Sequence, residues 1–302
     1  MNQRLFLITL VLFCFAIFYL SITQIPTSHA IASGNYNALA NEQSKNTTGS
    51  DTHAKWVTNV ASANKTQFLF NVTPKYDSSG KIISYTVGLS PKQTNLYRQV
   101  GFPSKSQKVA FIYPIFTQAA YKQGGFYDYY NKKCGTTCLT IPIPAKIDGG
   151  YSSSISAAMV LNLLNYSQIS DVDIDTNPNI LKKYSKIIVL HNEYVTQKEF
   201  DAITHHPNVI YLYPNALYAL VKINYNIGTI TLVKGHGYPA SASTSESSIG
   251  NGFGWKYDNS KYEYDNKCDN WQFIIIPHGK MLNCYPSLRI LTDQSLLHAI
   301  KN

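Results

Sequence analysis

The hydrophobic pattern of the chain begins with a run from Leu5 to Ile22 that contains no charged side chain. Its length is close to the about 20 apolar residues that span a bilayer and exceeds the roughly 7–15 of a signal-peptide core. The nearby positive charges, Arg4 and the amino terminus, precede the run, which predicts a cytoplasmic N-terminus. Residues 1–32 are therefore expected to be a cleaved signal peptide or a transmembrane anchor. Either one makes the protein extracytoplasmic, secreted or held at the cell surface.

Residues 33–54 are small and polar and show no apolar periodicity, a composition typical of a flexible linker. Two β-rich runs follow, one on each side of a turn signal at residues 77–80. They predict a hairpin within a small β region over residues 55–105.

Between residues 106 and 235 the pattern changes to buried strands that alternate with helices. Nearly continuous apolar runs, typical of strands covered on both faces, occupy 108–116, 186–190 and 208–213. Helical patterns occupy 154–164, 178–184 and 197–206, and a short strand is expected at 172–175. Thr196 and Glu199 have the spacing of a capping box at the start of the last helix. The alternation predicts an α/β fold with a parallel sheet flanked by helices.

After Lys222 the pattern returns to hairpins, at 223–235 and at 271–284, which predicts a disulfide-stapled β-rich extension over 236–302. Four of the 5 cysteines lie in the exported part, and an even count outside the cytosol indicates two disulfides. The local pairs are favoured among three connectivities, and the spacing lacks the paired CxxC of zinc sites. These pairs are Cys134–Cys138 and Cys268–Cys284. Four sequons predict N-glycosylation, at Asn46, Asn64, Asn71 and Asn165.

The net charge of +9 raises the question of nucleic-acid binding. Nucleic-acid recognition relies on arginine, and the chain has only Arg4, Arg98 and Arg289, without a dense basic stripe. The positive charge is expected to lie on a lysine-rich solvated surface, so no nucleic-acid partner is predicted.

Candidate chemistry lies where the predicted strands end, because ligands of open α/β sheets bind at the carboxyl ends of the strands. Polar and aromatic residues follow each of the three apolar runs. They are Thr117 and Tyr121, then His191, Glu193 and Tyr194, then Asn215 and Tyr218. Each taken singly also fits an ordinary turn, where Asn, His and Thr are common.

Three motifs in this order resemble the large subunit of N,N-dimethylformamidase. They are T-x-x-A-Y followed by Gly-Gly, H-x-E-Y-x-T at the start of a helix, and a strand ending in N-x-x-Y, within residues 108–221. The resemblance implies a class I glutamine-amidotransferase-like fold, which is a flavodoxin-like parallel sheet flanked by helices. It also implies a mononuclear iron, held by two tyrosines and a glutamate, that activates water for amide hydrolysis.

Carried onto this chain, the resemblance makes Tyr121 and Glu193 ligands of one iron, or zinc, ion. Their side-chain oxygens should then lie within a few ångströms of each other and of a second phenol. It implies that His191 is a second-shell or acid/base group and that Asn215 orients the substrate. The supporting positions are Thr117, Tyr194 and Tyr218. The second tyrosine stays open among Tyr113, Tyr127 and Tyr151, and the family often has aromatic residues where this chain has Gln118, Val195 and Ala219.

Two functions therefore compete. The first is a metal-dependent hydrolase of a small amide, for which the resemblance suggests a partner subunit. The second is a non-catalytic cell-surface module that binds a glycan or an envelope partner, either in the same crevice or through the aromatic and acidic segment 255–265. A cysteine-dependent glutaminase is excluded, because the strand end where its nucleophile would stand reads Pro214-Asn215 and no Gly-x-Ser-x-Gly motif replaces it.

Overall fold

The computed structural model describes residues 60, 67–144, 154–236, 238–239, 252–257 and 267–302. The apolar run, the linker and the sequons at Asn46 and Asn64 lie outside this part of the chain. Within it, no helix is long and apolar enough to cross a membrane.

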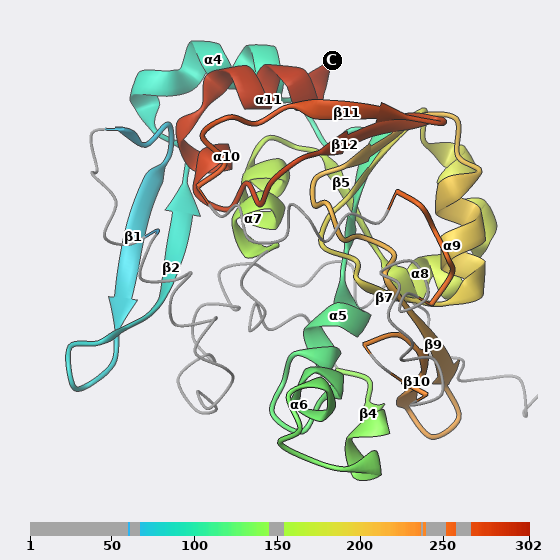
Figure 1. Cartoon of the computed structure of the whole chain (residues 1–302). Coiled ribbons are helices and arrows are strands. Elements are labelled where there is room, and N and C mark those ends of the chain that lie inside the picture. Colours follow the sequence, from blue (N-terminus) through green and yellow to red (C-terminus); the bar gives the residue numbers. More distant parts are fainter. Residues whose placement is uncertain (1–59, 61–66, 145–153, 237, 240–251, 258–266) are drawn as a thin grey trace, which may run out of the picture. The chain divides into compact units, whose positions relative to one another are not determined.

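The main sheet has six strands in the order β11-β12-β8-β6-β3-β5 (Figure 1). All neighbours pair in parallel except β11, which is antiparallel to β12 at the edge. Numbered along the chain, the five parallel strands lie in the order 2-1-3-4-5. The predicted parallel α/β architecture is confirmed. The strands are β3 (Val109–Tyr113), β5 (Ser167–Ser170), β6 (Lys186–Val189), β8 (Val209–Tyr211), β11 (Phe273–Ile276) and β12 (Gly279–Leu282).

Side chains on successive positions of these strands pack into two different cores. Phe111 and Ile188 belong to one cluster, whereas Ile112 and Ile187 belong to another. Because consecutive side chains of a strand point to opposite faces, both faces of the sheet are covered, as the unbroken apolar runs predict. The first core includes residues of α4 (Thr94–Val100), α7 (Ile155–Leu163), α10 (Arg289–Thr292) and α11 (Gln294–Lys301), and the second those of α8 (Asp171–Thr176) and α9 (Gln197–Thr204).

Two smaller sheets complete the described structure. The predicted hairpin at residues 77–80 is confirmed as the antiparallel pair of β1 (Asn71–Tyr76) and β2 (Ile82–Gly88). The other sheet has the order β4-β10-β9-β7 and lies beside α5 (Ile115–Ala120) and α6 (Phe126–Tyr130) (Figure 1). Its strands are β4 (Thr140–Pro142), β7 (Tyr194–Val195), β9 (Ala219–Asn224) and β10 (Thr229–Lys234). Short 3₁₀ helices lie at Pro91–Gln93, Thr136–Leu139 and Pro178–Lys183.

The strand expected at 172–175 is wrong, because these residues form α8 and the strand, β5, comes just before them. Ser170 starts the helix with a complete capping box, in which its hydroxyl accepts from the Asp173 N–H and the Asp173 carboxylate accepts from the Ser170 N–H. The alternation of Val172 and Ile174 with aspartates suggested a strand, but the cap decides the local structure. At α9 the Thr196 cap is confirmed, whereas Glu199 does not return a hydrogen bond.

The boundary expected at residue 236 does not separate a β-rich extension from the parallel sheet. The hairpin β11–β12 was predicted correctly, but β12 pairs with β8 and becomes the fifth parallel strand. The chain then continues into α10 and α11 rather than into further strands. Hairpin signals are local, whereas the partner of the second strand lies about seventy residues earlier in the sequence.

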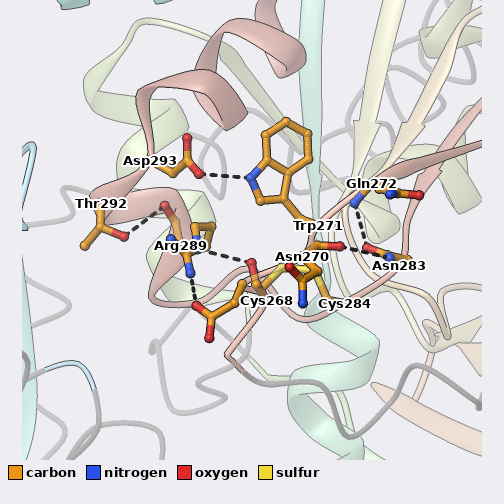
Figure 2. Close-up of a disulfide and its surroundings, with 10 residues drawn as sticks. Cys268, Asn270, Trp271, Gln272, Asn283, Cys284, Arg289, Thr292 and Asp293 are labelled. Carbon is orange, nitrogen blue, oxygen red and sulfur yellow. Dashed lines mark hydrogen bonds and ion pairs between the residues drawn. A yellow bond between two sulfur atoms is a disulfide. The ribbon is translucent and has the colours of Figure 1, made fainter.

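Both predicted disulfides, Cys134–Cys138 and Cys268–Cys284, are present. Figure 2 shows that the second lies beside a network in which the Arg289 Nε–H donates to the Cys268 carbonyl at 3.1 Å. Trp271 donates to the Asp293 carboxylate at 2.9 Å, and Asp293 caps α11. Disulfides persist in oxidising compartments, so these bonds indicate an extracytoplasmic protein.

The two described sequons differ in accessibility. Asn71 is exposed on β1, where its amide donates to the Leu89 carbonyl at 3.0 Å. Asn165 is half-buried in the left-handed conformation, with φ 63°, and its amide donates to the Phe102 carbonyl at 2.9 Å. Both amides already donate to a carbonyl, but Asn71 is exposed whereas Asn165 is half-buried, so Asn71 is the better acceptor of a glycan.

Three buried carboxyl groups meet where α8 packs on α9: those of Asp171, Asp175 and Glu199. Neither carboxylate oxygen of Glu199 has a hydrogen-bond partner among the described residues. Burial, and then the charges of Asp171 and Asp175, raise the pKa of Glu199 well above its ordinary value of 4.5. The folded protein therefore binds a proton that the unfolded chain has released, and stability falls as pH rises above about 4.5.

Replacing Glu199 with glutamine should remove this loss of stability at high pH. At pH 8 we expect the variant to be more stable by about 1 kcal/mol or more, which corresponds to roughly 2–4 °C in Tm. Thermal melts of Glu199→Gln and of wild type between pH 5 and 9 measure the difference. Asp201→Asn, an exposed carboxylate of the same helix, is the control and should leave the pH dependence unchanged. If Tm varies with pH in the same way in Glu199→Gln and in wild type, the prediction is wrong, and a partner stabilises Glu199 in its charged form.

Candidate functional site

Three side chains converge on the fully buried carboxylate of Glu193, and two of them come from distant parts of the sequence. The Tyr121 hydroxyl donates to Oε2 at 2.6 Å, and the His236 Nε2–H donates to Oε1. The Nε2 atom of His191 lies 3.6 Å from Oε2. The expected approach of Tyr121 to Glu193 is therefore confirmed as a direct hydrogen bond.

Tyr121 is placed by α5, which begins directly after β3. The carboxylate of Asp171 accepts from the Phe116 N–H in the first turn of this helix at 2.8 Å. The Thr117 hydroxyl, also fully buried, accepts from the Tyr194 N–H at 3.1 Å and so ties α5 to β7. Thr117 therefore fixes the position of Tyr121 relative to the segment that carries Glu193.

Glu193 lies in the short extended segment between β6 and β7. Its carbonyl accepts from the Ala219 N–H at 2.7 Å, and the carbonyl of Asn192 accepts from the Leu217 N–H at 2.8 Å. On the other side, the His191 N–H donates to the hydroxyl of Ser154, the residue that precedes α7, at 3.0 Å. The segment is thus held between two neighbours, which fixes the directions of His191 and Glu193.

Asn215 is hydrogen-bonded to His191 and is also linked to it through Tyr285. The Tyr285 hydroxyl donates to Asn215 Oδ1 at 2.7 Å and lies 3.4 Å from His191 Nε2. The His191 ring also packs against Tyr213, with ring centroids 5.5 Å apart. All four side chains are buried, so the imidazole has a fixed orientation.

Burial and neighbouring charges lower the pKa of both His191 and Glu193. Burial lowers the pKa of His191 to about 4, although the Glu193 charge and a hydrogen bond to Asn215 oppose the shift. Burial alone would raise the pKa of Glu193, but His236, then His191 and Tyr121, outweigh it and bring the pKa below its usual value. At neutral pH the site therefore holds a carboxylate anion beside a neutral imidazole.

Tyrosine rings surround these groups. The His236 ring lies 4.6 Å from that of Tyr218, 4.8 Å from that of Tyr130 and 5.5 Å from that of Tyr194, measured between centroids. Tyr130 is 50% exposed, so this side of the group reaches the surface. The predicted supporting residues Tyr194 and Tyr218 therefore pack against His236.

Of the two described tyrosines left open as a second ligand, Tyr127 packs against the group. Its ring stacks on that of Tyr121, with centroids 4.6 Å apart. The hydroxyl of Tyr113 donates to Gln118 at 3.0 Å instead. Tyr151 lies outside the described residues.

Sequence analysis missed His236 and Tyr285. His236 stands between two glycines directly after β10, and Tyr285 follows the disulfide cysteine Cys284. A histidine flanked by glycines at a strand end is a signal that could have drawn attention to His236. Its partner Glu193 is 43 residues away, however, and only the fold brings them together.

Within the described part of the chain, no three His, Cys, Asp or Glu side chains stand so that they could hold a metal ion by themselves. Tyr121 adds a phenol oxygen, a ligand type outside that set. The sequence matches no model of a known protein family and no curated protein sequence.

The position of His236 depends on Gly235, which has a φ of 133° and lies against β9. A Cβ atom there would stand 2.6 Å from the Cβ atom of Ala219. Gly235→Ala should therefore destabilise the fold by roughly 1–3 kcal/mol and move His236 away from Glu193. Denaturant unfolding measures the first effect, and the histidine NMR signals measure the second.

Gly228→Ala is the matched control, because Gly228 also has a positive φ, of 65°, but has open space where the Cβ would be. It should cost only the backbone strain of about 1–2 kcal/mol and leave the His236 signals unchanged. Equal effects of the two variants on His236 would contradict a specific role for Gly235.

Proposed function

We propose that this protein is a metal-dependent hydrolase of a carbon–nitrogen bond, acting on small amides outside the cytosol. The proposal includes a flavodoxin-like, class I glutamine-amidotransferase-like domain similar to that of N,N-dimethylformamidase. The strand order 2-1-3-4-5 supports this fold, because it is the order of flavodoxin-like sheets. The resemblance at the sequence level and the strand order are independent observations.

The observation that carries the proposal is the part-buried 2.6 Å hydrogen bond between Tyr121 and Glu193. A phenol and a carboxylate were matched to metal ligands from separate motifs, and they meet at the carboxyl ends of β3 and β6. His191 and Asn215, from the other matched positions, lie next to them. If these four were unrelated turn residues, we would not expect them to share one network of contacts.

The donor atoms fit a transition-metal ion. Phenolate and carboxylate oxygens are hard ligands, and imidazole binds iron and zinc well. On metal binding the Tyr121 hydroxyl proton can be released, and the Nε2 hydrogen of a neutral His236 can move to Nδ1, since a phenol binds as phenolate and an imidazole through a nitrogen lone pair. When bound, such an ion polarises an amide carbonyl and brings the pKa of a bound water toward about 7.

The residues of the chain supply the remaining steps. Neutral His191 has one ring nitrogen without a hydrogen, so it can accept the proton that water loses and return it to the departing amine. Tyr285 and Asn215 hold the imidazole in place, and Asn215 also offers an amide to orient the substrate. All four described cysteines are in disulfides, which agrees with a mechanism that uses no thiol nucleophile.

The test is release of amine from a panel of small N-alkyl amides by purified protein supplied with iron or zinc. We expect metal-dependent turnover that is lost in His191→Ala, while Tyr285→Phe keeps part of it. A metal-loaded protein that hydrolyses none of the amides would overturn the proposal.

A second candidate, a non-catalytic module that binds a glycan, is favoured by the exposed ring of Tyr130 beside the half-buried Tyr127. Aromatic faces of this kind stack on sugars. Binding of oligosaccharides that weakens in Tyr130→Ala, without any amide hydrolysis, would support this candidate.

A further inference from the structure

His236 reaches the site from an element that the resemblance does not include. It follows β10, beyond residues 108–221, and its Nε2–H donates to the same carboxylate that Tyr121 contacts. Tyr121 uses one oxygen of Glu193 and His236 uses the other. The two side chains therefore flank the carboxylate, and their donor atoms face the same group.

The backbone holds His236 in a costly conformation. Its φ is 50°, in the left-handed region, which a residue with a side chain adopts at a cost of about 1–2 kcal/mol. Two backbone hydrogen bonds between Gly235 and Tyr238, of 2.9 and 3.0 Å, close the tight turn around it. Such conformations persist where the surrounding structure enforces them, and they gather at functional sites.

The imidazole is also confined by its surroundings. Its side chain is 11% exposed, and the rings of Tyr194 and Tyr218 pack around it. The turn places a compact nitrogen donor at one fixed position.

We infer that His236 is the third protein ligand of the metal ion, together with Tyr121 and Glu193, in place of a second tyrosine. The inference rests on the proposed function. Two phenolates and a carboxylate carry three negative charges, which suits a ferric ion. One phenolate, one carboxylate and a neutral imidazole carry two, so this site is matched to a divalent ion such as Zn²⁺ or Fe²⁺.

The test is calorimetric titration of metal-free, full-length protein with Zn²⁺ alone. Wild type should bind one ion per chain and release protons on binding. His236→Ala and His236→Gln should both weaken binding by more than about 100-fold, beyond what loss of a group that merely orients a ligand causes. His205→Ala, which removes an exposed histidine after α9, should bind as wild type does. Circular dichroism and thermal melts verify that each variant is folded.

A second readout identifies the ligand set without any activity. Binding of Zn²⁺ should produce the ultraviolet difference spectrum of a tyrosinate, and Tyr121→Phe should abolish it. Wild-type affinity in both His236 variants would overturn the inference and leave the proposed function intact. Stronger binding of ferric ion than of Zn²⁺ would also overturn it. A wild-type protein that binds no metal would overturn the proposed function itself.

Discussion

Replacing Glu193 with glutamine should abolish amide hydrolysis and lower the affinity for metal by more than about 100-fold. The amide carbonyl can still accept from the Tyr121 hydroxyl, and the amide N–H can donate to His236 Nε2 when that imidazole carries its hydrogen on Nδ1, so the buried network keeps its hydrogen bonds. What is lost is the negative charge that a cation requires. Amine release and Zn²⁺ titration of the variant beside wild type measure both effects.

Glu193→Ala separates chemistry from folding. It removes the acceptor that Tyr121 and His236 share, and each buried donor left without a partner costs about 1–3 kcal/mol. We therefore expect the alanine variant to be inactive and less stable, and the glutamine variant to be inactive at nearly full stability. Hydrolysis that persists in folded Glu193→Gln would contradict a metal-ligand role for this residue.

Removing the disulfide between Cys268 and Cys284 should lower the free energy of unfolding by about 3 kcal/mol or more. It closes a loop with a sequence separation of 16. A disulfide across a loop of this size lowers the entropy of the unfolded chain by an amount that stabilises the fold by about 3 kcal/mol. Both cysteines are fully buried within the first core, so alanines would also leave space unfilled. Denaturant unfolding of Cys268→Ala/Cys284→Ala against wild type gives the value.

Cys134→Ala/Cys138→Ala is the matched control for this experiment. Its loop has a sequence separation of only 4, for which the same relation gives about 2 kcal/mol. A larger loss from the 134–138 pair than from the 268–284 pair would contradict this account. Because Tyr285 adjoins Cys284, the Cys268→Ala/Cys284→Ala variant should also reduce turnover by loosening His191.

The local parts of the fold could be predicted because short-range physics determines them. The apolar runs that became β3, β6 and β8 are unbroken because both faces of each strand are buried. The two disulfides join near neighbours in sequence, and Thr196 caps α9 through a hydrogen bond three residues away. In each case the pattern and its partner lie within one short window.

Errors arose where a distant partner or a competing local bond decides the structure. The pairing of β12 with β8 depends on the whole sheet, so residues 273–282 suggested a separate extension. At 172–175 a period of two was misread as a strand, because the Ser170 cap was not recognised. Neither error could be corrected from hydrophobic periodicity alone.

The candidate site was predictable for residues at the ends of the parallel strands. Tyr121, Glu193 and Asn215 follow three such strands, and parallel strands bring their carboxyl ends to one edge. His236 follows an antiparallel hairpin instead, and Tyr285 comes from the region after β12. A search limited to the carboxyl ends of parallel strands therefore does not find His236 or Tyr285.

The central claim is that the cluster at Glu193 is a metal centre, and the metal content of the protein as purified tests it most directly. Elemental analysis should find close to one iron or zinc ion per chain in wild type and essentially none in folded Glu193→Gln. Wild-type protein that is folded and remains metal-free after incubation with either ion would contradict the claim.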